Sequence, residues 1–199
     1  MELREAITSR RMVRRCADAP LDASVVDELV DLALRAPSAG WSQGQGFVVV
    51  RDGAQRAAIA EAAGEPDYLA RGFDPWLSSA PALVVPCADE RAYRERYDAP
   101  DKDGGPGRWD VPYWWLDLGA AVQNLLLLAT EAGLAAGFLG AHAVDGLDSL
   151  LGLPERVHPA GIVTLGHPPD DEPPPTTSER RGRRERAAVV HHDHWSDPS

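Results

Sequence analysis

The segment LDLGAAVQNLLLLATEAG, residues 116–133, decides the fold of this chain. Apolar residues occupy nearly every face of its helical turns, which predicts a central buried helix over 116–132 that Gly133 is placed to end. Four polar residues interrupt the run: Asp117, Gln123, Asn124 and Glu131. They argue against a membrane span, which needs roughly 18 uninterrupted apolar residues.

Shorter apolar runs on either side of this helix predict strands. They are FVVV at 47–50, PALVVPC at 81–87 and AGIVTLG at 160–166. Helical periodicity predicts further helices over 2–10, 24–35 and 54–63, the second of them capped by Asp22 or Ser24. Few strands among several helices, without regular strand–helix alternation, predict an α+β fold.

Two segments differ in character from the rest of the chain. Residues 89–115 pass from a charged helix-like stretch to glycine and proline and then to aromatic residues, so we expect an insertion or lid there. Residues 167–199 begin with a proline-rich stretch that can form neither a helix nor a central strand, so we expect an extended C-terminal arm. No internal repeat divides the chain, and its 199 residues suit one domain, 1–199.

The composition limits the class of protein. The formal net charge of -11 argues against a general nucleic-acid binder, because contact with the phosphate backbone needs a basic face. Cys16 and Cys87 lie far apart, which indicates neither a disulfide framework nor a cysteine metal site. The N-terminal stretch carries arginines but no apolar signal core. The sequence therefore predicts a soluble, cytoplasmic protein.

Positive charge is concentrated in two short clusters. The first holds Arg10, Arg11, Arg14 and Arg15, and the second holds Arg180, Arg181, Arg183, Arg184 and Arg186. Such clusters can bind a small anion, or they can be solvated faces paired with the abundant carboxylates.

Several familiar catalytic motifs do not occur in the sequence. It has no GxGxxG between a strand and a helix, no Walker A motif and no GxSxG elbow. His191, His192 and His194 lie near the end of the chain without acidic or thiol partners at a metal-binding spacing, so we expect no metal site.

Five segments, in order, resemble motifs of the nitroreductase family. They are SRRMVRR at 9–15, APSAGWSQGQGFVVV at 36–50, the long helix with GLAAGFLG at 133–140, LLGLP at 150–154 with IVTLGHP at 162–168, and the arginine-rich arm that ends in VVHHDHW. The resemblance spans nearly the whole chain and is greatest to an actinobacterial subgroup. It implies a central mixed β-sheet flanked by helices, with a bound FMN.

Four residues depart from the family pattern. Met12 stands where a serine is common, Trp41 where an asparagine is common, and Gly44-Gln45 where Pro-Trp is common. These positions approach the flavin in the family, so the resemblance implies flavin contacts that differ here.

The resemblance also implies roles for the arginines. Arginine binds phosphate through two parallel hydrogen bonds, so the two clusters are expected to converge on the FMN phosphate. The expected phosphate ligands are Arg10 and Arg184 with Arg183, and Arg11 is a further expected cofactor-binding residue. Arg14, one helical turn beyond Arg10, would face the pyrimidine end of the ring, where its charge stabilises the reduced flavin.

Other flavin contacts are expected from loops. Ser38 and Gln43 are candidates for polar contacts with the ring or ribityl chain, or they cap their own loop. In the loop after the long helix, the backbone of Leu139, Gly140 and Ala141 would meet flavin N5 and O4.

Large aromatic residues are candidates for a substrate lid. Trp41, Trp109, Tyr113 and Trp114 could cover the flavin, or the last three could pack in the core or at a subunit interface. His142 is expected to be structural.

The implied function is ping-pong hydride transfer, in which NADH or NADPH reduces FMN and a small electron-poor acceptor then oxidises it. Two alternatives stay open: a flavin-consuming, dehalogenating or biosynthetic enzyme of the same fold, and a flavin-binding module without catalysis. The long apolar helix has more surface than one small domain covers. A homodimer with FMN between the subunits, and with the arm wrapped around the neighbour, is therefore expected.

Overall fold

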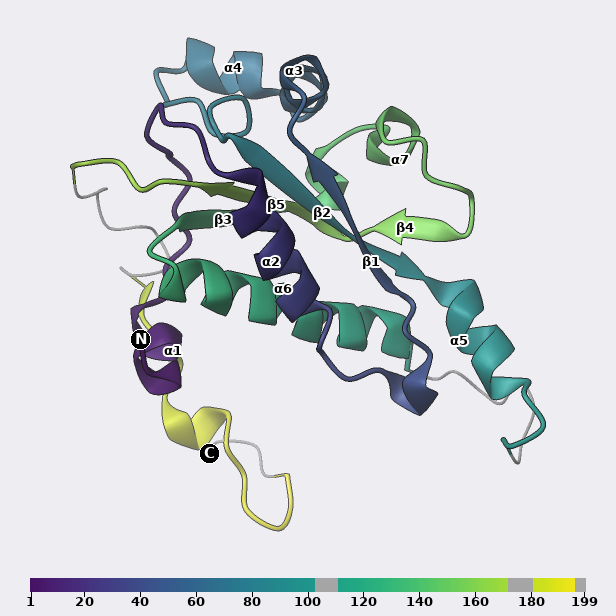
Figure 1. Cartoon of the computed structure of the whole chain (residues 1–199). Helices are drawn as coiled ribbons and strands as arrows, with labels where there is room; N and C mark the ends of the chain where they lie inside the picture. Colours follow the sequence, from purple (N-terminus) through teal and green to yellow (C-terminus); the bar gives the residue numbers. More distant parts are fainter. Residues whose placement is uncertain (103–110, 172–180, 196–199) are drawn as a thin grey trace.

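The computed structural model describes residues 1–102, 111–171 and 181–195, and its described strands form one sheet (Figure 1). The strands are β1 (Gln45–Val50), β2 (Ala82–Asp89), β3 (Ala135–Gly140), β4 (Val157–Pro159) and β5 (Gly161–Gly166). The order is β1-β2-β5-β3, with β4 paired to β2. Every described pairing is antiparallel. The sheet of the described strands is therefore antiparallel and not the expected mixed sheet. Strands β2 and β3 run in the same direction, but β5 lies between them and is antiparallel to both.

Seven described helices surround the sheet. They are α1 (Leu3–Ser9), α2 (Ala23–Ala33), α3 (Gly53–Ala62), α4 (Glu65–Ala70), α5 (Glu90–Tyr97), α6 (Tyr113–Glu131) and α7 (Leu147–Leu150). Asp22 caps α2 by accepting a hydrogen bond from the Ser24 amide, and Asp52 caps α3 in the same way through the Gln55 amide. Within the described ranges no helix is long and apolar enough to span a membrane.

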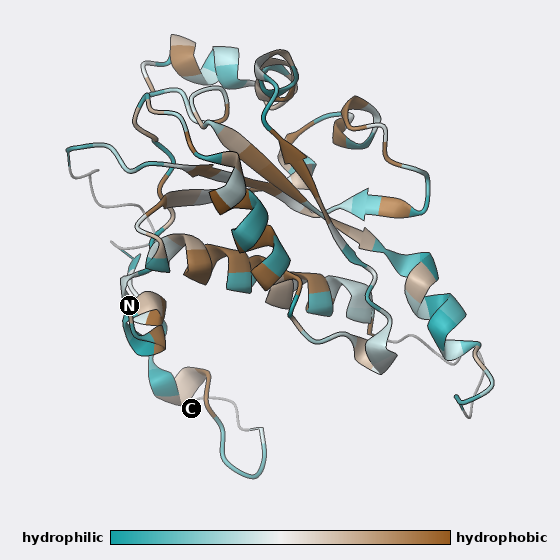
Figure 2. Ribbon diagram, in the orientation of Figure 1, coloured by the Kyte–Doolittle hydropathy of each residue, from teal (hydrophilic) through white to brown (hydrophobic). Residues whose placement is uncertain are grey.

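The sheet is covered on both faces. Along β2, Val84 belongs to the core shared with α2 and α6, whereas Leu83 and Val85 belong to the core on the α3 side. Figure 2 shows the apolar strands in the middle of the molecule and mixed colouring on the outer helices. This burial on both faces explains why the strands appear in the sequence as continuous apolar runs.

Two parts of the long-helix region differ from the expectation. Helix α6 begins at Tyr113, three residues earlier than expected, so the end of the expected insertion belongs to it. The segment expected to be a flavin-contacting loop forms strand β3 instead, because residues Ala135–Gly140 pair along their length with β5. The described end of the C-terminal arm, residues 181–195, contains one short helix, η3 (Arg186–Ala188), and extends away from the sheet in Figure 1.

Candidate functional site

The first arginine cluster lies along the edge of the sheet. Helix α1 ends at Ser9, with Arg10 as its C-terminal cap residue, and the Val13 amide donates a hydrogen bond of 2.8 Å to the Ala136 carbonyl of β3. Because β3 is the last strand of the sheet, this bond fastens the N-terminal segment to an otherwise open edge. The arginines are thereby held beside the strand rather than on a mobile tail.

The four arginines of this cluster have different surroundings. Nη1 of Arg10 is buried and has no hydrogen-bond partner among the described residues. Arg15 forms ion pairs with Asp74, at 3.6 Å, and with Asp171. The guanidinium carbon of Arg14 lies 4.9 Å from the ring centroid of Trp76. Arg11 is exposed. The structure therefore gives Arg10 and Arg14 positive charges that no described carboxylate neutralises.

Met12 does not share the position of its arginine neighbours. Its side chain packs against the core between α2, α6 and the sheet. Met12 thus makes a core contact where a serine is common in the family, and its approach to a flavin stays a prediction.

The end of β3 offers fewer backbone donors than expected. Leu139 and Gly140 are half-buried and pair in register with Ile162 and Gly161 of β5. The Ala141 amide, however, donates to the Ala160 carbonyl at 3.0 Å. That donor is engaged within the fold in this conformation, and the expected contact of the Ala141 backbone with flavin N5 or O4 stays a prediction. The His142 imidazole is exposed and lies against Gly140.

The second group of predicted contacts lies in the loop around the short helix η1 (Ala39–Trp41). The Ser38 hydroxyl accepts a hydrogen bond of 3.0 Å from the Gln43 amide, so it caps the loop. Trp41 and Gln43 both have positive φ, 60° and 50°, which is uncommon for residues with side chains. Trp41 is 70% exposed. The loop thus holds a large aromatic side chain in solvent on a strained backbone.

Buried polar groups hold this loop in place. The Asp117 carboxylate of α6 accepts hydrogen bonds from the Ala39 amide at 2.7 Å and from the Tyr93 hydroxyl at 2.9 Å. Burial, followed by the hydrogen bond to Asp117, raises the pKa of Tyr93. Nε of Arg96 donates to the Gly40 carbonyl at 2.7 Å. The loop geometry is therefore fixed by α5 and by the first turns of α6.

Gly44 explains one departure from the family pattern. A Cβ atom at this position would lie 2.5 Å from the Tyr93 ring and 2.6 Å from the Asp89 carbonyl oxygen. No side chain fits there unless both the Tyr93 ring and the Asp89 backbone move.

The two groups of predicted flavin contacts lie at opposite ends of α6. Asp117, near the first end, binds the η1 loop, whereas Glu131, at the last turn, lies 3.9 Å from the amino group of Met1, where α1 begins. At about 1.5 Å per residue, these two anchor points are about 21 Å apart along the helix. In Figure 1, α1 lies near one end of α6 and the segment that follows α2 runs to the other end. Within one chain, the segment that carries Arg10 and the loop that carries Gln43 are therefore anchored at opposite ends of α6.

The aromatic candidates divide in the same way. Trp114 is only 8% exposed and packs edge-on against Tyr93, with ring centroids 6.2 Å apart. Its predicted place in a lid is wrong, because it faces the interior from the first turn of α6. Tyr113, which precedes it, is 39% exposed. Trp109 lies outside the described residues.

The C-terminal arginines are exposed in the described arm. Nη2 of Arg184 donates to the Ala188 carbonyl at 3.0 Å, within its own segment, and Arg183 is exposed beside it. Their convergence with Arg10 on one phosphate stays a prediction. Among the described residues, no group of three or more histidine, cysteine or acidic side chains is arranged to hold a metal ion.

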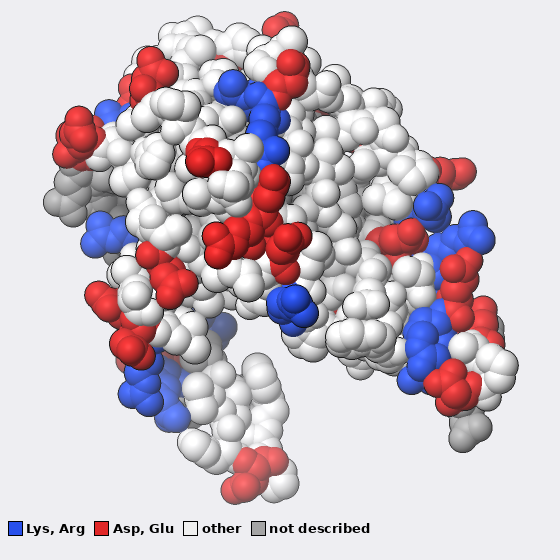
Figure 3. All heavy atoms as spheres, viewed as in Figure 1, with Lys and Arg blue, Asp and Glu red and all other residues white. Residues whose placement is uncertain are grey.

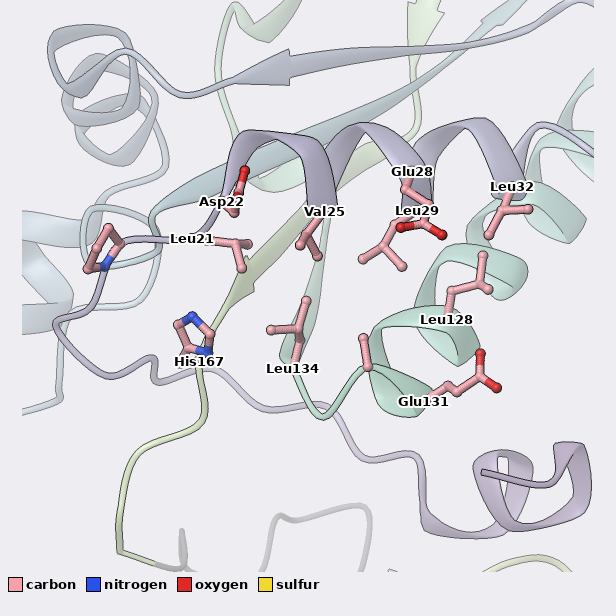
Figure 4. A pocket seen from close by; sticks show the side chains of 12 residues that line it. Leu21, Asp22, Val25, Glu28, Leu29, Leu32, Leu128, Glu131, Leu134 and His167 are labelled. Atoms are coloured by element: carbon pink, nitrogen blue, oxygen red, sulfur yellow. The ribbon is translucent and has the colours of Figure 1, made fainter.

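An open groove of about 510 Å³ lies between α2 and the last turns of α6 (Figure 4). Its apolar side chains come from Leu21, Val25, Leu29, Leu32, Leu128 and Leu134. Its acidic side chains, among them Glu28 and Glu131, would repel a phosphate. In Figure 3 the carboxylates gather over α2 in the centre of the view. The groove is therefore not a site for a dianionic ligand.

Two residues beside Arg14 were missed by the sequence analysis, Trp76 and Thr164. The Trp76 ring lies against the guanidinium of Arg14, and its indole N–H donates to the Thr164 hydroxyl at 3.2 Å. Trp76 belongs to no recognisable motif, and Thr164 lies in the IVTLGHP segment, which does not indicate this contact. Only the fold brings Trp76 next to Arg14. Asp117 did give a signal, since it is an acid on the buried side of an apolar helix.

Comparison with known proteins agrees with this architecture. The family model described as "Nitroreductase family" matches residues 7–167. A provisionally named NADH dehydrogenase/NAD(P)H nitroreductase of Archaeoglobus fulgidus is 30% identical over 171 residues, which cover 84% of this chain and 86% of the relative.

Two flavin-related proteins are also similar. An FMN reductase [NAD(P)H] of Bacillus subtilis is 29% identical, over 84% of this chain and 66% of the relative. The solved structure of an NADPH:FMN oxidoreductase from Vibrio harveyi, complexed with NAD+, is 26% identical with a TM-score of 0.75, and the match covers 99% of this chain and 79% of that one. The predicted family and α+β fold are thus confirmed: the chain belongs to the nitroreductase family.

Proposed function

We propose that this chain is an FMN-dependent oxidoreductase in which NADH or NADPH reduces the flavin and a small electron-poor acceptor reoxidises it. The acceptor classes that we propose are nitroaromatics, quinones and enones. The single observation that carries the proposal is the buried Nη1 of Arg10, which has no hydrogen-bond partner among the described residues. A buried guanidinium donor without a partner is costly, and a phosphate oxygen would satisfy it.

The residues of the sheet edge fit FMN. Arg10 would bind the phosphate, and Arg14 would lie near the ring, where its charge favours the reduced flavin. When bound, FMN supplies the hydride chemistry, whereas the chain supplies binding, orientation and electrostatic stabilisation. The names of the Bacillus and Vibrio relatives, an FMN reductase and an NADPH-flavin oxidoreductase, support this cofactor and this reductant.

We further propose that the working form is a homodimer. The separation of Arg10 and Gln43 along α6 supports it, because a second copy could bring its η1 loop to the flavin held by the first. Exposed apolar side chains on α1 and α6 support it as well: Leu3 is 65% exposed and Leu116 is 60% exposed. Apolar surface of this kind is typical of subunit interfaces.

Cofactor identification and anaerobic reduction test the proposal. The purified protein, incubated with FMN, should show a bound-flavin absorption band, and NADH or NADPH should bleach it. The acceptors should then restore the band, each in a separate experiment, with the flavin recovered intact. A protein that takes up no FMN would overturn the proposal. Loss of the flavin ring during turnover would instead support the flavin-consuming alternative.

A further inference from the structure

The cation–aromatic pair of Arg14 and Trp76 is the most specific feature of the sheet edge that family membership leaves unexplained. The Trp76 ring lies under the Arg14 guanidinium, 4.9 Å from its central carbon. Arg14 itself is exposed. An arginine stacked on an aromatic face is attracted to the ring while its N–H groups remain available in the plane of the guanidinium.

Trp76 is itself held at two points, its backbone and its side chain. Its backbone amide donates to Oε1 of Glu65 at 2.6 Å, and the Leu77 amide donates to the same oxygen at 2.6 Å. Glu65 is buried, so these charge-assisted bonds are shielded from water. At the other end of the side chain, Nε1 donates to the fully buried Thr164 hydroxyl at 3.2 Å. These bonds fix the backbone of Trp76 and the nitrogen of its indole.

A glycine allows these groups to meet. A Cβ atom on Gly137 of β3 would lie 2.8 Å from the Val13 carbonyl oxygen, 3.1 Å from Oγ1 of Thr164 and 3.1 Å from Nε1 of Trp76. The absence of a side chain at Gly137 thus lets the N-terminal segment, β5 and the indole converge on one point of the sheet edge.

Arg15, the next residue in the chain, provides the contrast. It is held by the carboxylates of Asp74 and Asp171, and the hydrogen bond from Arg15 lowers the pKa of Asp171. Two carboxylates fix Arg15 and also neutralise its charge. Among the described residues no carboxylate pairs with Arg14. An aromatic ring fixes a cation without neutralising the positive charge of the cation. A cation that stabilises a nearby anion must keep that charge.

We infer that Trp76 is a positioning residue: it holds Arg14, un-neutralised, against the pyrimidine end of the flavin and thereby raises the flavin midpoint potential. The inference rests on the proposed function for the identity of the bound group. The geometry of the Arg14–Trp76 pair does not depend on it, so the two can be tested separately.

The first experiment uses the protein without flavin. The ring current of Trp76 should shift the NMR signals of the Arg14 side chain upfield, and comparison with Arg14→Ala assigns those signals. The shift should vanish in Trp76→Leu and persist in part in Trp76→Phe, which keeps an aromatic face. Unshifted Arg14 signals in the unmodified protein, or a shift that survives Trp76→Leu, would overturn the inference whatever the protein binds.

The second experiment measures the midpoint potential of bound FMN. Trp76→Leu should lower it in the same direction as Arg14→Ala and by most of the same amount, and the double variant should lower it no further, because the two residues act as one unit. Trp76→Phe should recover much of the potential. A matched control is Phe73→Leu, which removes the exposed ring beside Arg71 on the same loop, 5.7 Å from its guanidinium carbon. This control should leave the potential unchanged.

The outcomes separate the two proposals. If Arg14→Ala shifts the potential and Trp76→Leu does not, the positioning role is wrong while the proposed function stands. If neither variant shifts it although the Arg14 signals respond to Trp76, Arg14 does not face the flavin, and the inference is wrong in its second half. If the protein binds no FMN, the proposed function fails, and the NMR experiment still decides whether Trp76 holds Arg14.

Discussion

Arg10 and Arg15 lie in the same short segment, yet their electrostatic surroundings are opposite. Arg10 has a buried donor atom without a described partner, whereas Arg15 is paired with two carboxylates. We expect Arg10→Ala to weaken FMN binding by about 1.5–3 kcal/mol, the usual scale for a hydrogen bond to a charged group. Titration calorimetry measures this change. Riboflavin, which lacks the phosphate, should bind the variant and the unmodified protein equally.

Arg15→Ala is the matched control for that prediction. Because Asp74 and Asp171 already neutralise the charge of Arg15, its removal should leave the preference for FMN over riboflavin unchanged. Equal losses of FMN and riboflavin affinity in Arg10→Ala would contradict the phosphate role and would assign Arg10 to the fold.

The two buried thiols predict how stability depends on pH. Burial raises the pKa of both Cys16 and Cys87 from 9.0 to about 11. The folded pKa values lie above the unfolded ones, so the stability is fully present below pH 9 and is lost as the pH rises through 11. The free energy of unfolding should therefore fall over this window, by at most about 2.7 kcal/mol per thiol.

Denaturant unfolding across that pH range checks the prediction. Cys87→Ser should flatten the pH dependence of the unfolding free energy, since a serine hydroxyl does not titrate there. A curve that keeps its full slope in the double variant Cys16→Ser/Cys87→Ser would show that other groups cause the loss.

At the scale of elements, the sequence predicted the parts whose pattern is local. The β-branched run at 47–50 and the capped periodicity of α2 correspond to elements of the structure within a few residues. Strand β3 was missed because AAGFLG has too few β-branched residues to indicate a strand, and it becomes one through pairing with β5. The Arg14–Trp76 pair was missed because only the fold brings these residues together.

The η1 loop is the element whose anchoring is easiest to test. Asp117→Ala leaves the Ala39 amide and the Tyr93 hydroxyl without their acceptor, and Tyr93 is buried. We expect the free energy of unfolding to fall by about 2–4 kcal/mol, since each buried group left unpaired costs about 1–3 kcal/mol. Urea unfolding measures the loss. Asp117→Asn keeps one acceptor oxygen and should lose less.

Asp145→Ala serves as the control for this element. Asp145 is exposed and has no hydrogen bond to a described residue, so its removal should change the free energy of unfolding by less than about 0.5 kcal/mol. A similar loss in Asp117→Ala and Asp145→Ala would mean that Asp117 does not anchor the loop.

At the scale of the whole molecule, the proposed homodimer would account both for the exposed apolar surface and for the separation of the predicted flavin contacts. The leucines of the groove between α2 and α6 line an open cavity (Figure 4), and Leu116 lies exposed at the other end of α6. A second copy that covers such surface would also bring its η1 loop, with Gln43 and Trp41, toward the Arg10 and Arg14 of the first. The resulting dimer would hold two composite sites.

Mixing two defective chains tests whether the site is composite. One chain carries Arg10→Ala and the other carries Ser38→Ala/Gln43→Ala, and each alone should bind FMN weakly. In a mixed dimer, one composite site carries both sets of substitutions, and the other site has the unmodified Arg10 of one chain and the unmodified Ser38 and Gln43 of the other. After joint unfolding and refolding in equal amounts, about half of the dimers should be mixed, so about one quarter of all sites should bind FMN with the affinity of the unmodified protein. A site built within a single chain predicts no recovery, because every chain in the mixture carries a defect. Mixing the two folded proteins without unfolding is the control, and it should restore binding only as fast as subunits exchange.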